Sequence, residues 1–528
     1  VTAREVADVI RVRQTSFWID EYKRLYTAIS SAAELLALVS SVDLSVPTFD
    51  EGLKRYCSDW FRIDQLYRKF IYAFRTSEGP HPLDPLRDEV EKRYSNEYVY
   101  ELGKVWQQRV DEAETWTSSA LRSQKTFYRD YVEHLVREDK KAVVIISDAM
   151  RYEVGEELGL RIRQEDRFDA SVDAVLGVLP SYTQLGMAAL LPHTNLKYSP
   201  DANVVLADGQ PTNGTANRKK VLEGVGGTAI QAEDFKALNA EERRELFKAN
   251  SVLYIYHNVI DSTGDKQGTE RSVFEAVEQT FLELIDLVKK AASANATNMF
   301  VTADHGFLFQ DESLPEQFFL STNPEGDDIK VTNKRFVLGH GLKNDDAFTT
   351  FSSAQLELDG DLEIQIPKSI HRLKRPGGGT RFVHGGATLQ EVVVPVVSIN
   401  KKRKSDTRPV NVTVLPESDK ITTNQIVVRL FQTEPVSEKV QPLTVRAGLY
   451  VGETLISNHI EFVFDEESDD IRDRYKNADM LLGQDSNDYN NRAVEFRLEE
   501  KIPNTNYWRT YTKVMYTLKR SFVSDFDI

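Results

Sequence analysis

Four short apolar runs of this 528-residue chain each lead into residues that bind metal ions. The runs are rich in β-branched and aromatic residues and end in turn residues, a pattern typical of buried strands of a parallel sheet. The carboxyl ends of such strands meet at one edge of the sheet, where ligands bind. We therefore expect one shared site from the residues that follow the runs: Asp148; His257, Asp261 and Asp265; Asp304 and His305; and His384.

Carboxylate oxygens and imidazole nitrogens gathered at one edge suit Zn²⁺, Mn²⁺ or Mg²⁺. Some of these residues also have a purely structural interpretation. Asp148 could cap a helix predicted over 149–160, and His384, which precedes a Gly-Gly pair, could be a turn residue. His257 could be a hydrogen-bond donor behind the ligands or a packed histidine. The Asp-His pair after the third run is harder to explain structurally, because two polar groups at a buried strand end need partners.

A candidate nucleophile follows a turn at Pro180 and Ser181. The residues from Thr183 onward suit a short buried helix, so Thr183 falls in its first turn. Free backbone N–H groups there stabilise a phosphate or an alkoxide, and a metal ion on the hydroxyl would lower its pKa further. We predict Thr183 as the nucleophile, with Ser181 as the alternative.

The order of these residues resembles the alkaline phosphatase superfamily, which includes nucleotide pyrophosphatase/phosphodiesterases and cofactor-independent phosphoglycerate mutases. The superfamily resemblance covers roughly 140–400. Within the superfamily, the amino-acid sequence of four segments is similar to that of type A PglZ proteins, which are a component of BREX bacteriophage-exclusion systems. These segments are 146–153, 179–183, 256–261 and 384–391.

The resemblance implies an α/β fold, an alkaline-phosphatase-like three-layer α/β/α sandwich, with two divalent metal ions. Zinc is expected first, with manganese or magnesium as alternatives. Many diesterases of the superfamily have histidine where this chain has Asp265, and the extra carboxylate shifts the preference toward harder ions such as Mn²⁺. The implied ligands of one ion are Asp148, Thr183, Asp304 and His305, and those of the other are Asp261, Asp265 and His384.

The activity implied by the resemblance is hydrolysis of phosphate esters through a phospho-threonine at Thr183. We expect a phosphodiesterase that acts on nucleotides or nucleic acid, in antiviral defence beside other BREX proteins. Two alternatives stay open. One is a phosphomonoesterase, which would need a further cation on the third non-bridging oxygen. The other is a metal-containing assembly scaffold whose hydrolysis depends on partners.

Composition favours a cytoplasmic enzyme that does not enter a membrane. No apolar run is long enough to span a bilayer, no signal peptide is visible, and the single cysteine, Cys57, excludes internal disulfides. The chain begins at Val1 within a helical pattern, so we expect a fragment that lacks an N-terminal domain.

The net charge of −16 argues against a surface that coats nucleic acid. Basic residues near His384 could still steer a polyanion toward the site, or could be ordinary solvated loops. These substrate candidates are Lys374, Arg375 and Arg381, and further basic clusters near Arg218 and Lys334 lie in inserts expected to overhang the sheet edge.

Periodicity divides the chain into three regions. Residues 1–138 show apolar spacing near 3.6 and predict a helical bundle. Residues 139–400 alternate strands and helices and form the predicted catalytic domain, with cap inserts near 193–248 and 312–378. Residues 407–528 alternate with period two between turn signals, which predicts a C-terminal β-sandwich.

Overall fold

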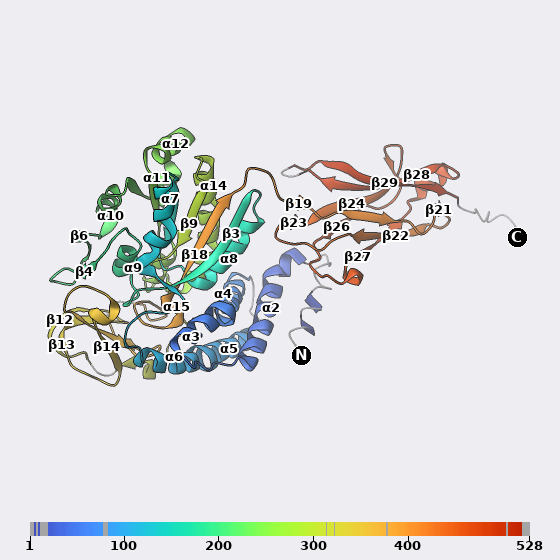
Figure 1. Cartoon of the computed structure of the whole chain (residues 1–528). Coiled ribbons are helices and arrows are strands. Elements are labelled where there is room, and N and C mark those ends of the chain that lie inside the picture. Colours follow the sequence, from blue (N-terminus) through green and yellow to red (C-terminus); the bar gives the residue numbers. More distant parts are fainter. Residues whose placement is uncertain are drawn as a thin grey trace. The chain divides into compact units, whose positions relative to one another are not determined.

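The computed structural model describes residues 5–6, 9–10, 19–77, 83–312, 314–320, 323–375, 379–502 and 505–519 (Figure 1). They form two compact units. One comprises the described parts of 1–162 and 169–401, and the other comprises 163–168 and the described residues from 402 onward. Among the described residues, no helix combines the length and the apolar character needed to cross a bilayer.

A seven-stranded sheet in the order β1-β3-β18-β9-β2-β8-β7 forms the centre of the first unit. Strand β2 pairs in parallel with both β8 and β9, whereas β18 runs antiparallel to β9. Every residue of β2 and β8 is buried, as expected for strands covered on both faces. The strands are β1 Arg122–Ser123, β2 Ala142–Ser147, β3 Phe168–Leu176, β7 Gly227–Gln231, β8 Val252–His257, β9 Asn298–Thr302 and β18 Val393–Lys401.

Helices cover both faces of this sheet, which makes it the middle of three layers. Tyr254 of β8 donates a hydrogen bond to the carbonyl oxygen of Leu190, directly after α9 (Thr183–Ala189). The register places Pro395 of β18 on the opposite face, because side chains alternate along a strand. Helix α8 (Tyr152–Gln164) lies against that proline at Gly155, where a methyl group would come within 2.2 Å of it.

The N-terminal region is helical, as predicted, except that β1 joins the central sheet beside β3. A two-residue strand leaves no periodic signal, so the sequence did not reveal it. The α-helices are α2 Ile19–Ser41, α3 Phe49–Arg55, α4 Phe61–Thr76, α5 Asp84–Lys92, α6 Glu101–Asp111 and α7 His134–Arg137. Shorter turns connect them: π-helical η1 Tyr56–Trp60, η2 Arg93–Tyr100 and η4 Tyr128–Glu133, and 3-10 η3 Gln124–Thr126.

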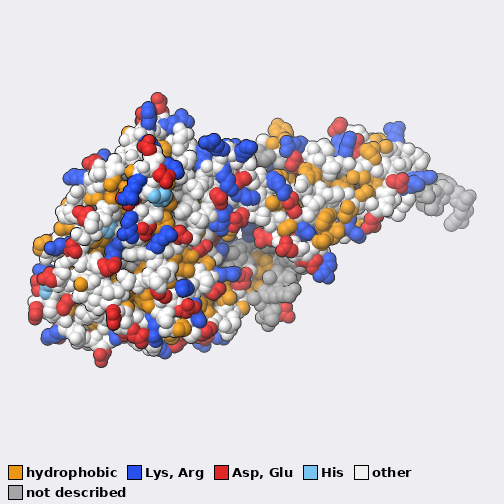
Figure 2. Space-filling view, in the orientation of Figure 1, with side chains coloured by type: hydrophobic (Ala, Val, Ile, Leu, Met, Phe, Trp, Pro, Cys, Tyr) orange, Lys and Arg blue, Asp and Glu red, His pale blue; other side chains and the backbone are white. Residues whose placement is uncertain are grey.

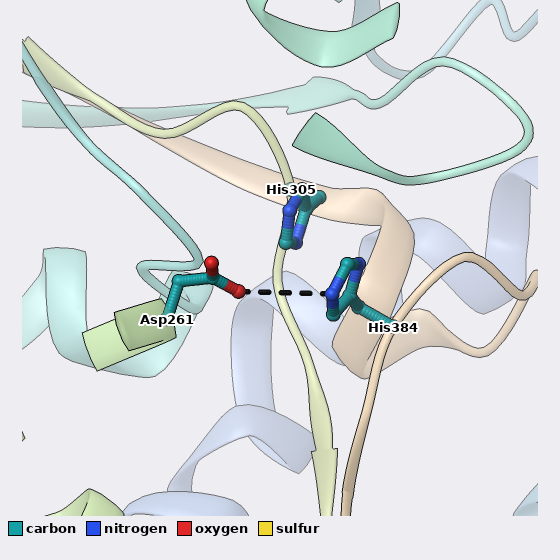
Figure 3. A group of neighbouring side chains, drawn as sticks. All are labelled: Asp261, His305 and His384. Carbon is teal, nitrogen blue, oxygen red and sulfur yellow. Dashed lines mark ion pairs between the residues drawn. The ribbon is translucent and has the colours of Figure 1, made fainter. Parts of the chain in front are cut away.

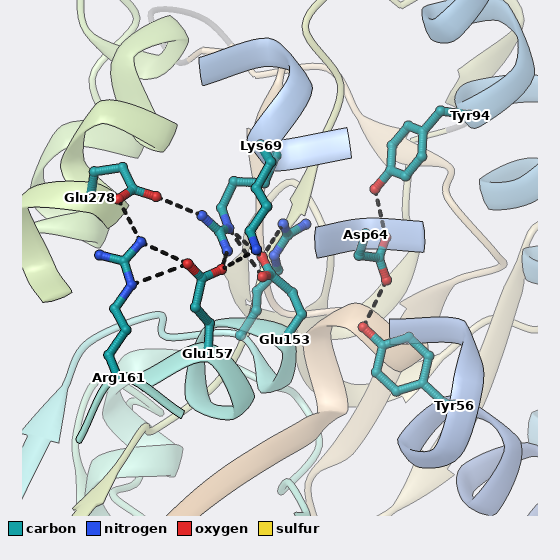
Figure 4. A network of polar contacts seen from close by, with 10 residues as sticks. Tyr56, Asp64, Lys69, Tyr94, Glu153, Glu157, Arg161 and Glu278 are labelled. Atoms are coloured by element: carbon teal, nitrogen blue, oxygen red, sulfur yellow. Dashed lines mark hydrogen bonds and ion pairs between the residues drawn. The ribbon is translucent and has the colours of Figure 1, made fainter. Parts of the chain in front are cut away.

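A buried ionic network ties α4 to the helices of the α/β unit (Figure 4). The guanidinium of Arg68 contacts Glu153 at 3.0 Å, Glu157, and Glu278 at 2.9 Å, and its side chain is fully buried. Glu153 and Glu157 belong to α8, and Glu278 belongs to α14 (Val273–Ser293). Beside it, Asp64 accepts hydrogen bonds from tyrosine hydroxyl groups of η1 and η2. A buried arginine is costly without such partners, so the network fixes the helical region against α8 and α14.

Glu157→Gln is expected to lower the free energy of unfolding by about 3 kcal/mol at pH 7 and by only about 2 kcal/mol at pH 3.5. Although burial alone would raise it, the charges of Arg68, Lys69 and Arg161 lower the pKa of Glu157 from 4.5 to about 2. A carboxylate whose pKa is lower in the folded protein than in the unfolded chain adds to the free energy of unfolding. This contribution is complete above about pH 4.5 and is lost as the pH falls through 2. Urea unfolding at both pH values measures the difference.

The control for Glu157 is Glu89→Gln, which removes an exposed ion pair with Arg93 and is expected to leave the urea midpoint nearly unchanged. An equal penalty for Glu157→Gln at both pH values would contradict the assigned role of the ion pairs.

The two predicted cap inserts form small sheets of their own. The first contains the order β4-β5-β6 and the second the order β12-β13-β15-β14. One part of the first insert differs from the prediction, because Gly227–Gln231 is the edge strand β7 of the central sheet. The other elements of the first insert are β4 Leu196–Tyr198, β5 Val205–Ala207, β6 Gln210–Pro211, α10 Gly214–Glu223, α11 Ala232–Ala237 and α12 Ala240–Ala249. Those of the second are β11 Phe319–Leu320, β12 Gly326–Thr332, β13 Val337–Leu342, β14 Phe348–Ser352, β15 Glu363–Pro367 and β16 Arg372–Leu373, with η6 Glu316–Phe318 and η7 Ala354–Leu356.

The fourth apolar run is not a strand of the parallel sheet, so that prediction is wrong. Its residues Phe382–Val383 form β17, which pairs antiparallel with β10 (Leu308–Phe309) in a separate two-stranded sheet. The reason is its length, since a run of two apolar residues is too short for its pattern to show which sheet or strand it pairs with. Strand β10 begins three residues after His305, so this pairing still brings His384 to the edge predicted for it.

The second unit is a β-sandwich, as predicted. A three-stranded sheet (β20-β22-β27) and a six-stranded sheet built on β21-β29-β28-β24-β25, with β26 beside β24, share one apolar core. Leu430 and Met480 from the first sheet pack with Leu449 and Phe496 from the second. The strands are β19 Arg408–Pro409, β20 Val412–Leu415, β21 Lys420–Ile421, β22 Gln425–Gln432, β23 Val440–Gln441, β24 Leu443–Val451, β25 Thr454–Leu455, β26 Ile460–Phe464, β27 Tyr475–Leu481, β28 Ala493–Lys501 and β29 Trp508–Leu518.

Candidate metal centre

Two groups of potential ligands meet at the carboxyl ends of the central strands. The first cluster is Asp148, Asp304 and His305, and the second cluster is Asp261, His305 and His384. Within each cluster the ligand atoms all lie within 4.8 Å of one another. The rings of His305 and His384 stack at a centroid distance of 4.2 Å, and Figure 3 shows Asp261 facing them from a separate helix. The structure thus brings five of the predicted residues together at one edge of the sheet.

Backbone contacts orient the carboxylates of the first cluster. Asp148 follows β2, and the next residue, Ala149, turns the chain with a φ of 60°. The amides of Ala149 and His305 both donate to Oδ1 of Asp304 at 3.0 Å. Because these two donors occupy Oδ1, the other oxygen of Asp304 faces the site, 3.4 Å from Nε2 of His305.

His305 is held as a neutral ligand. Its Nδ1 lies 2.8 Å from the carbonyl oxygen of Gly306, an acceptor, so Nδ1 carries the hydrogen and Nε2 presents a lone pair. That nitrogen lies 3.6 Å from Oδ1 of Asp148 and 3.2 Å from the hydroxyl of Thr183. Burial lowers the pKa of His305 to about 4, against the opposing charge of Asp304. The imidazole is thus unprotonated at neutral pH, as metal binding requires.

The second cluster combines a short helix with the loop after β17. Asp261 lies in α13 (Ile260–Gly264), and Asp265 caps its end one helical turn later. Nε2 of His384 lies 3.6 Å from Oδ1 of Asp261 and 3.5 Å from Oδ1 of Asp265. Asp265 is half exposed and lies outside both clusters, although it contacts His384. Although burial opposes it, the hydrogen bond with His384 lowers the pKa of Asp265.

The donor set fits divalent cations. Oδ1 of Asp148, Oδ1 of Asp261 and Oδ2 of Asp304 are buried and have no hydrogen-bond partner among the described residues. Burial, followed by the nearby carboxylates, raises the pKa of Asp148 well above its usual range, and burial raises that of Asp261 to about 6. Buried carboxylates this close repel one another unless cations lie between them. Mixed oxygen and nitrogen donors suit zinc and manganese.

Thr183 is the first residue of α9 and is half-buried beside the first cluster. Its hydroxyl is 3.2 Å from Nε2 of His305. The helix approaches closely because of Gly186, where a methyl group would lie 2.2 Å from the carbonyl oxygen of Asp304. The structure therefore brings the predicted nucleophile to the predicted ligands.

Two other candidates have structural contacts instead. The hydroxyl of Ser181 donates to the carbonyl oxygen of Gly386 at 2.6 Å, which holds the loop that follows His384. The ring of His257 lies 3.1 Å from the hydroxyl of Ser147 and 3.5 Å from the carboxylate of Glu283, outside both clusters. Its backbone carbonyl accepts a hydrogen bond from the amide of Asp148, so His257 helps to position that ligand.

The basic candidates lie around the loop before His384. Arg381 donates to Glu270 at 3.2 Å and to the carbonyl oxygen of Asp311 at 2.8 Å, and Lys374 pairs with Glu316. Arg375 is exposed and has no ion pair with a described residue. None of the three belongs to the clusters, so contact with a ligand anchored there remains a prediction.

Four further charged residues surround the clusters; the sequence indicated the basic segments of Arg218 and Lys334–Arg335 but no role for Glu391. Arg335 pairs with Glu391 at 2.7 Å, and the same carboxylate accepts the amide hydrogen of Gly386, so this buried pair shapes the loop after His384. The spacing Thr388-x-x-Glu391 is a helix-capping signature that could have revealed Glu391. Arg218 acts electrostatically on Asp148, and Lys334 acts on Asp265. Both lie in the inserts, where no strand pattern indicated their position.

Comparison with known proteins identifies the family. The model of the BREX system PglZ alkaline phosphatase-like domain matches residues 127–399, which is 273 of the 528 residues. The alkaline phosphatase-like protein BrxZ of Escherichia coli O9:H4 (strain HS) is 38% identical over 495 residues, covering 89% of this chain and 57% of that protein. The alkaline phosphatase-like protein PglZ of Bacillus cereus (strain H3081.97) is 33% identical over 541 residues, covering 98% and 62%.

Solved structures are much less similar. Murine ectonucleotide pyrophosphatase/phosphodiesterase 5 shares 12% identity, with a TM-score of 0.35 over 49% of this chain and 88% of that one. The human protein of the same name shares 11% identity, with a TM-score of 0.34 over 49% and 88%. Scores this low do not establish a common fold by themselves.

The family match covers more than half of the chain and includes every residue of both clusters. The curated relatives are longer, and the chain spans less than two thirds of their length. The predicted family and its alkaline phosphatase-like fold class are thereby confirmed. The chain belongs to the PglZ family of BREX-system alkaline phosphatase-like proteins.

Proposed function

We propose that this chain carries a metal-dependent phosphoesterase centre that uses Thr183 as its nucleophile. The observation that carries the proposal is the position of the Thr183 hydroxyl, 3.2 Å from Nε2 of His305 and beside two clusters whose carboxylates each have one buried oxygen without a hydrogen bond to a described residue. A scaffold that only stores metal has no need of a hydroxyl at this point. The substrates we propose are phosphodiesters of nucleotides or nucleic acid.

Two ions would be held by the residues gathered here. Asp148, Thr183, Asp304 and His305 would hold one, and Asp261, Asp265 and His384 would hold the other. When bound, the ions would neutralise charge on the phosphate oxygens and favour the alkoxide form of Thr183. Zinc is the first expectation for this donor set, and the additional carboxylate of Asp265 also suits manganese or magnesium.

The protein groups have separate tasks in this proposal. The oxygen of Thr183 attacks phosphorus as the ester oxygen leaves with the threonine proton as an alcohol, and water then cleaves the phospho-threonine, which releases a phosphate monoester and restores the hydroxyl. The contact between Oδ1 of Asp304 and the amide of Ala149 holds two strand ends in register around the reacting phosphate. Arg218 acts electrostatically on Asp148 and would add positive charge to the site there.

The biological setting follows from the family. We propose that the chain acts in the cytoplasm as part of a longer BREX protein, together with other BREX proteins. Figure 2 shows acidic and basic side chains mixed over the face that it draws, so binding of a polyanion would depend on local basic groups and not on a basic face.

The test compares bis-p-nitrophenyl phosphate with p-nitrophenyl phosphate. The protein is stripped of metal with EDTA and reconstituted with Zn²⁺, Mn²⁺ or Mg²⁺. We expect no turnover after EDTA, recovery with metal, and a higher kcat/KM for the diester. Preference for the monoester would support a phosphatase instead. Stoichiometric metal binding without turnover of either ester would support the scaffold alternative and overturn the proposal.

A further inference from the structure

A basic cavity of about 500 Å³ opens beside the second cluster. Its walls carry the cations Lys334, Arg372, Lys374 and Arg375 and the ring of Phe319. Glu316 is the one carboxylate among the described residues that line it. We call it the basic cavity. Such an excess of positive charge is unusual on a chain whose net charge is −16, and it points to an anionic ligand.

Arg372 gives the strongest sign that an anion belongs there. Its side chain is buried, and its guanidinium donates only to uncharged oxygens, the carbonyls of Ile370 and Thr380 and the side-chain amide of Gln310. It forms no ion pair with a described residue. Burial lowers the pKa of Arg372 to about 9 although the charges of Glu391 and Glu270 oppose this shift, so an anion in the cavity would relieve part of the cost of burying this cation.

Lys334 connects the cavity with the metal centre. It lines the cavity, and the next residue, Arg335, lies against Gly385 and Gly386, which directly follow His384. The side chain is half-buried, and its ammonium forms no hydrogen bond or ion pair with a described residue. Burial lowers the pKa of Lys334, against the charges of Asp265 and Glu270. An anion held by Lys334 would therefore lie next to a phosphate at the second cluster.

Phe319 adds a surface for a base or sugar. The ammonium of Lys374 lies over this ring, 5.6 Å from its centroid, and pairs with Glu316. Both members of that ion pair are more than half exposed, and exposed pairs contribute little free energy, so an incoming phosphate could replace Glu316. A charged groove next to an aromatic ring is the arrangement that binds single-stranded nucleotides.

We propose that the basic cavity binds a second phosphate of the substrate, adjacent to the phosphate that reacts. This inference rests on the proposed function, and it names the substrate class: nucleotides that carry a neighbouring phosphate, as every residue of a nucleic acid strand does. The cations select for the second phosphate, whereas Thr183 and the clusters act on the first.

The test measures binding to the metal-loaded Thr183→Ala chain by calorimetry. The probes are thymidine 3′,5′-bisphosphate, thymidine 3′-monophosphate and thymidine 5′-monophosphate. We expect the bisphosphate to bind about tenfold tighter than either monophosphate, since contacts to a charged group are worth at least that factor. Its affinity should also fall more steeply with salt, by about one unit of logarithmic slope. Equal affinities for all three probes would overturn the inference.

Variants assign the difference to the cavity. Lys334→Gln combined with Arg375→Gln is expected to remove the tenfold preference for the bisphosphate. The matched control is Lys343→Gln, an exposed lysine directly after β13 that pairs with Glu325, and it should keep the preference. Arg375→Gln alone changes an exposed position and should reduce the preference for the bisphosphate. This single variant replaces the double variant in the test if the double variant does not fold. A preference that survives in all variants would overturn the inference.

Two further comparisons distinguish a nucleic acid strand from a free nucleotide as the ligand, and a failure of this inference from a failure of the proposed function. Thymidine 5′-diphosphate is added as a probe, and tighter binding of the 3′,5′-bisphosphate supports a strand whereas tighter binding of the diphosphate supports a free nucleotide. If bis-p-nitrophenyl phosphate is hydrolysed but the bisphosphate has no advantage, the inference fails and the proposed function stands. If the advantage depends on the cavity but no ester is hydrolysed, the inference stands and the catalytic proposal fails.

Discussion

Replacing Thr183 with alanine is expected to lower kcat for a phosphodiester by about 10⁴-fold while both metal ions remain bound. The hydroxyl lies beside Nε2 of His305, and no other described hydroxyl group contacts either cluster. Four carboxylates and two imidazoles of the proposed ligand set would still hold the ions, so metal content should not change. The measurement pairs steady-state hydrolysis with metal analysis of the same sample.

Two variants control this experiment. Thr183→Ser keeps a hydroxyl at the start of α9 and should retain activity within about tenfold of the wild type. Ser181→Ala removes the alternative nucleophile, whose hydroxyl donates to Gly386, and should affect activity far less than Thr183→Ala. Full activity in Thr183→Ala, or a larger loss in Ser181→Ala, would show that the nucleophile is misassigned.

Asp304→Asn is expected to weaken metal binding by more than about 100-fold and to abolish hydrolysis. Loss of a group that only supports a ligand already costs 10–100-fold in affinity, so loss of a ligand charge should cost more. Asparagine keeps an oxygen that can accept from the amides of Ala149 and His305, so the loop should retain its shape. Titration against a chromophoric chelator gives the affinity, and elemental analysis gives the stoichiometry.

The stability of the metal-free proteins separates lost binding from lost folding. Asp304→Asn removes a negative charge close to Asp148, so the metal-free variant should melt at a temperature no lower than the metal-free wild type. The matched control is Asp286→Asn, an exposed position that pairs with Lys290, and it should bind both ions normally. Retention of two ions with unchanged affinity in Asp304→Asn would remove Asp304 from the ligand set.

Sequence patterns located the first three strand ends because each follows a long apolar run. Asp148 lies directly after one such strand, Asp304 lies two residues after another, and Thr183 begins the predicted helix. The strand before His384 was misassigned because two apolar residues carry no information about their pairing partner, which is fixed by the distant strand β10. Edge strand β7 was missed for a related reason, since its glycine and threonine resemble a loop.

Burial of charged residues was the other feature that patterns did not reveal. Arg68 is fully buried although arginine is normally exposed, and its three partners come from two helices far along the chain. Lys334 and Arg372 likewise line the basic cavity from separate segments of one insert. Only the folded arrangement brings such partners together, so the sequence could indicate basic segments near the site but not the burial of Arg68 or the cavity that Lys334 and Arg372 share.

The contacts of Arg68 also determine how this protein can be shortened for expression. A fragment that began at residue 139 would retain Glu153, Glu157 and Glu278 but lose the guanidinium that compensates them. Arg151 and Arg161 would remain as partners, but three carboxylates would then share two cations beside α8, which starts four residues after Asp148. A truncated version that preserves the metal centre should therefore include α4, even though α4 lies outside the segment matched by the PglZ domain model.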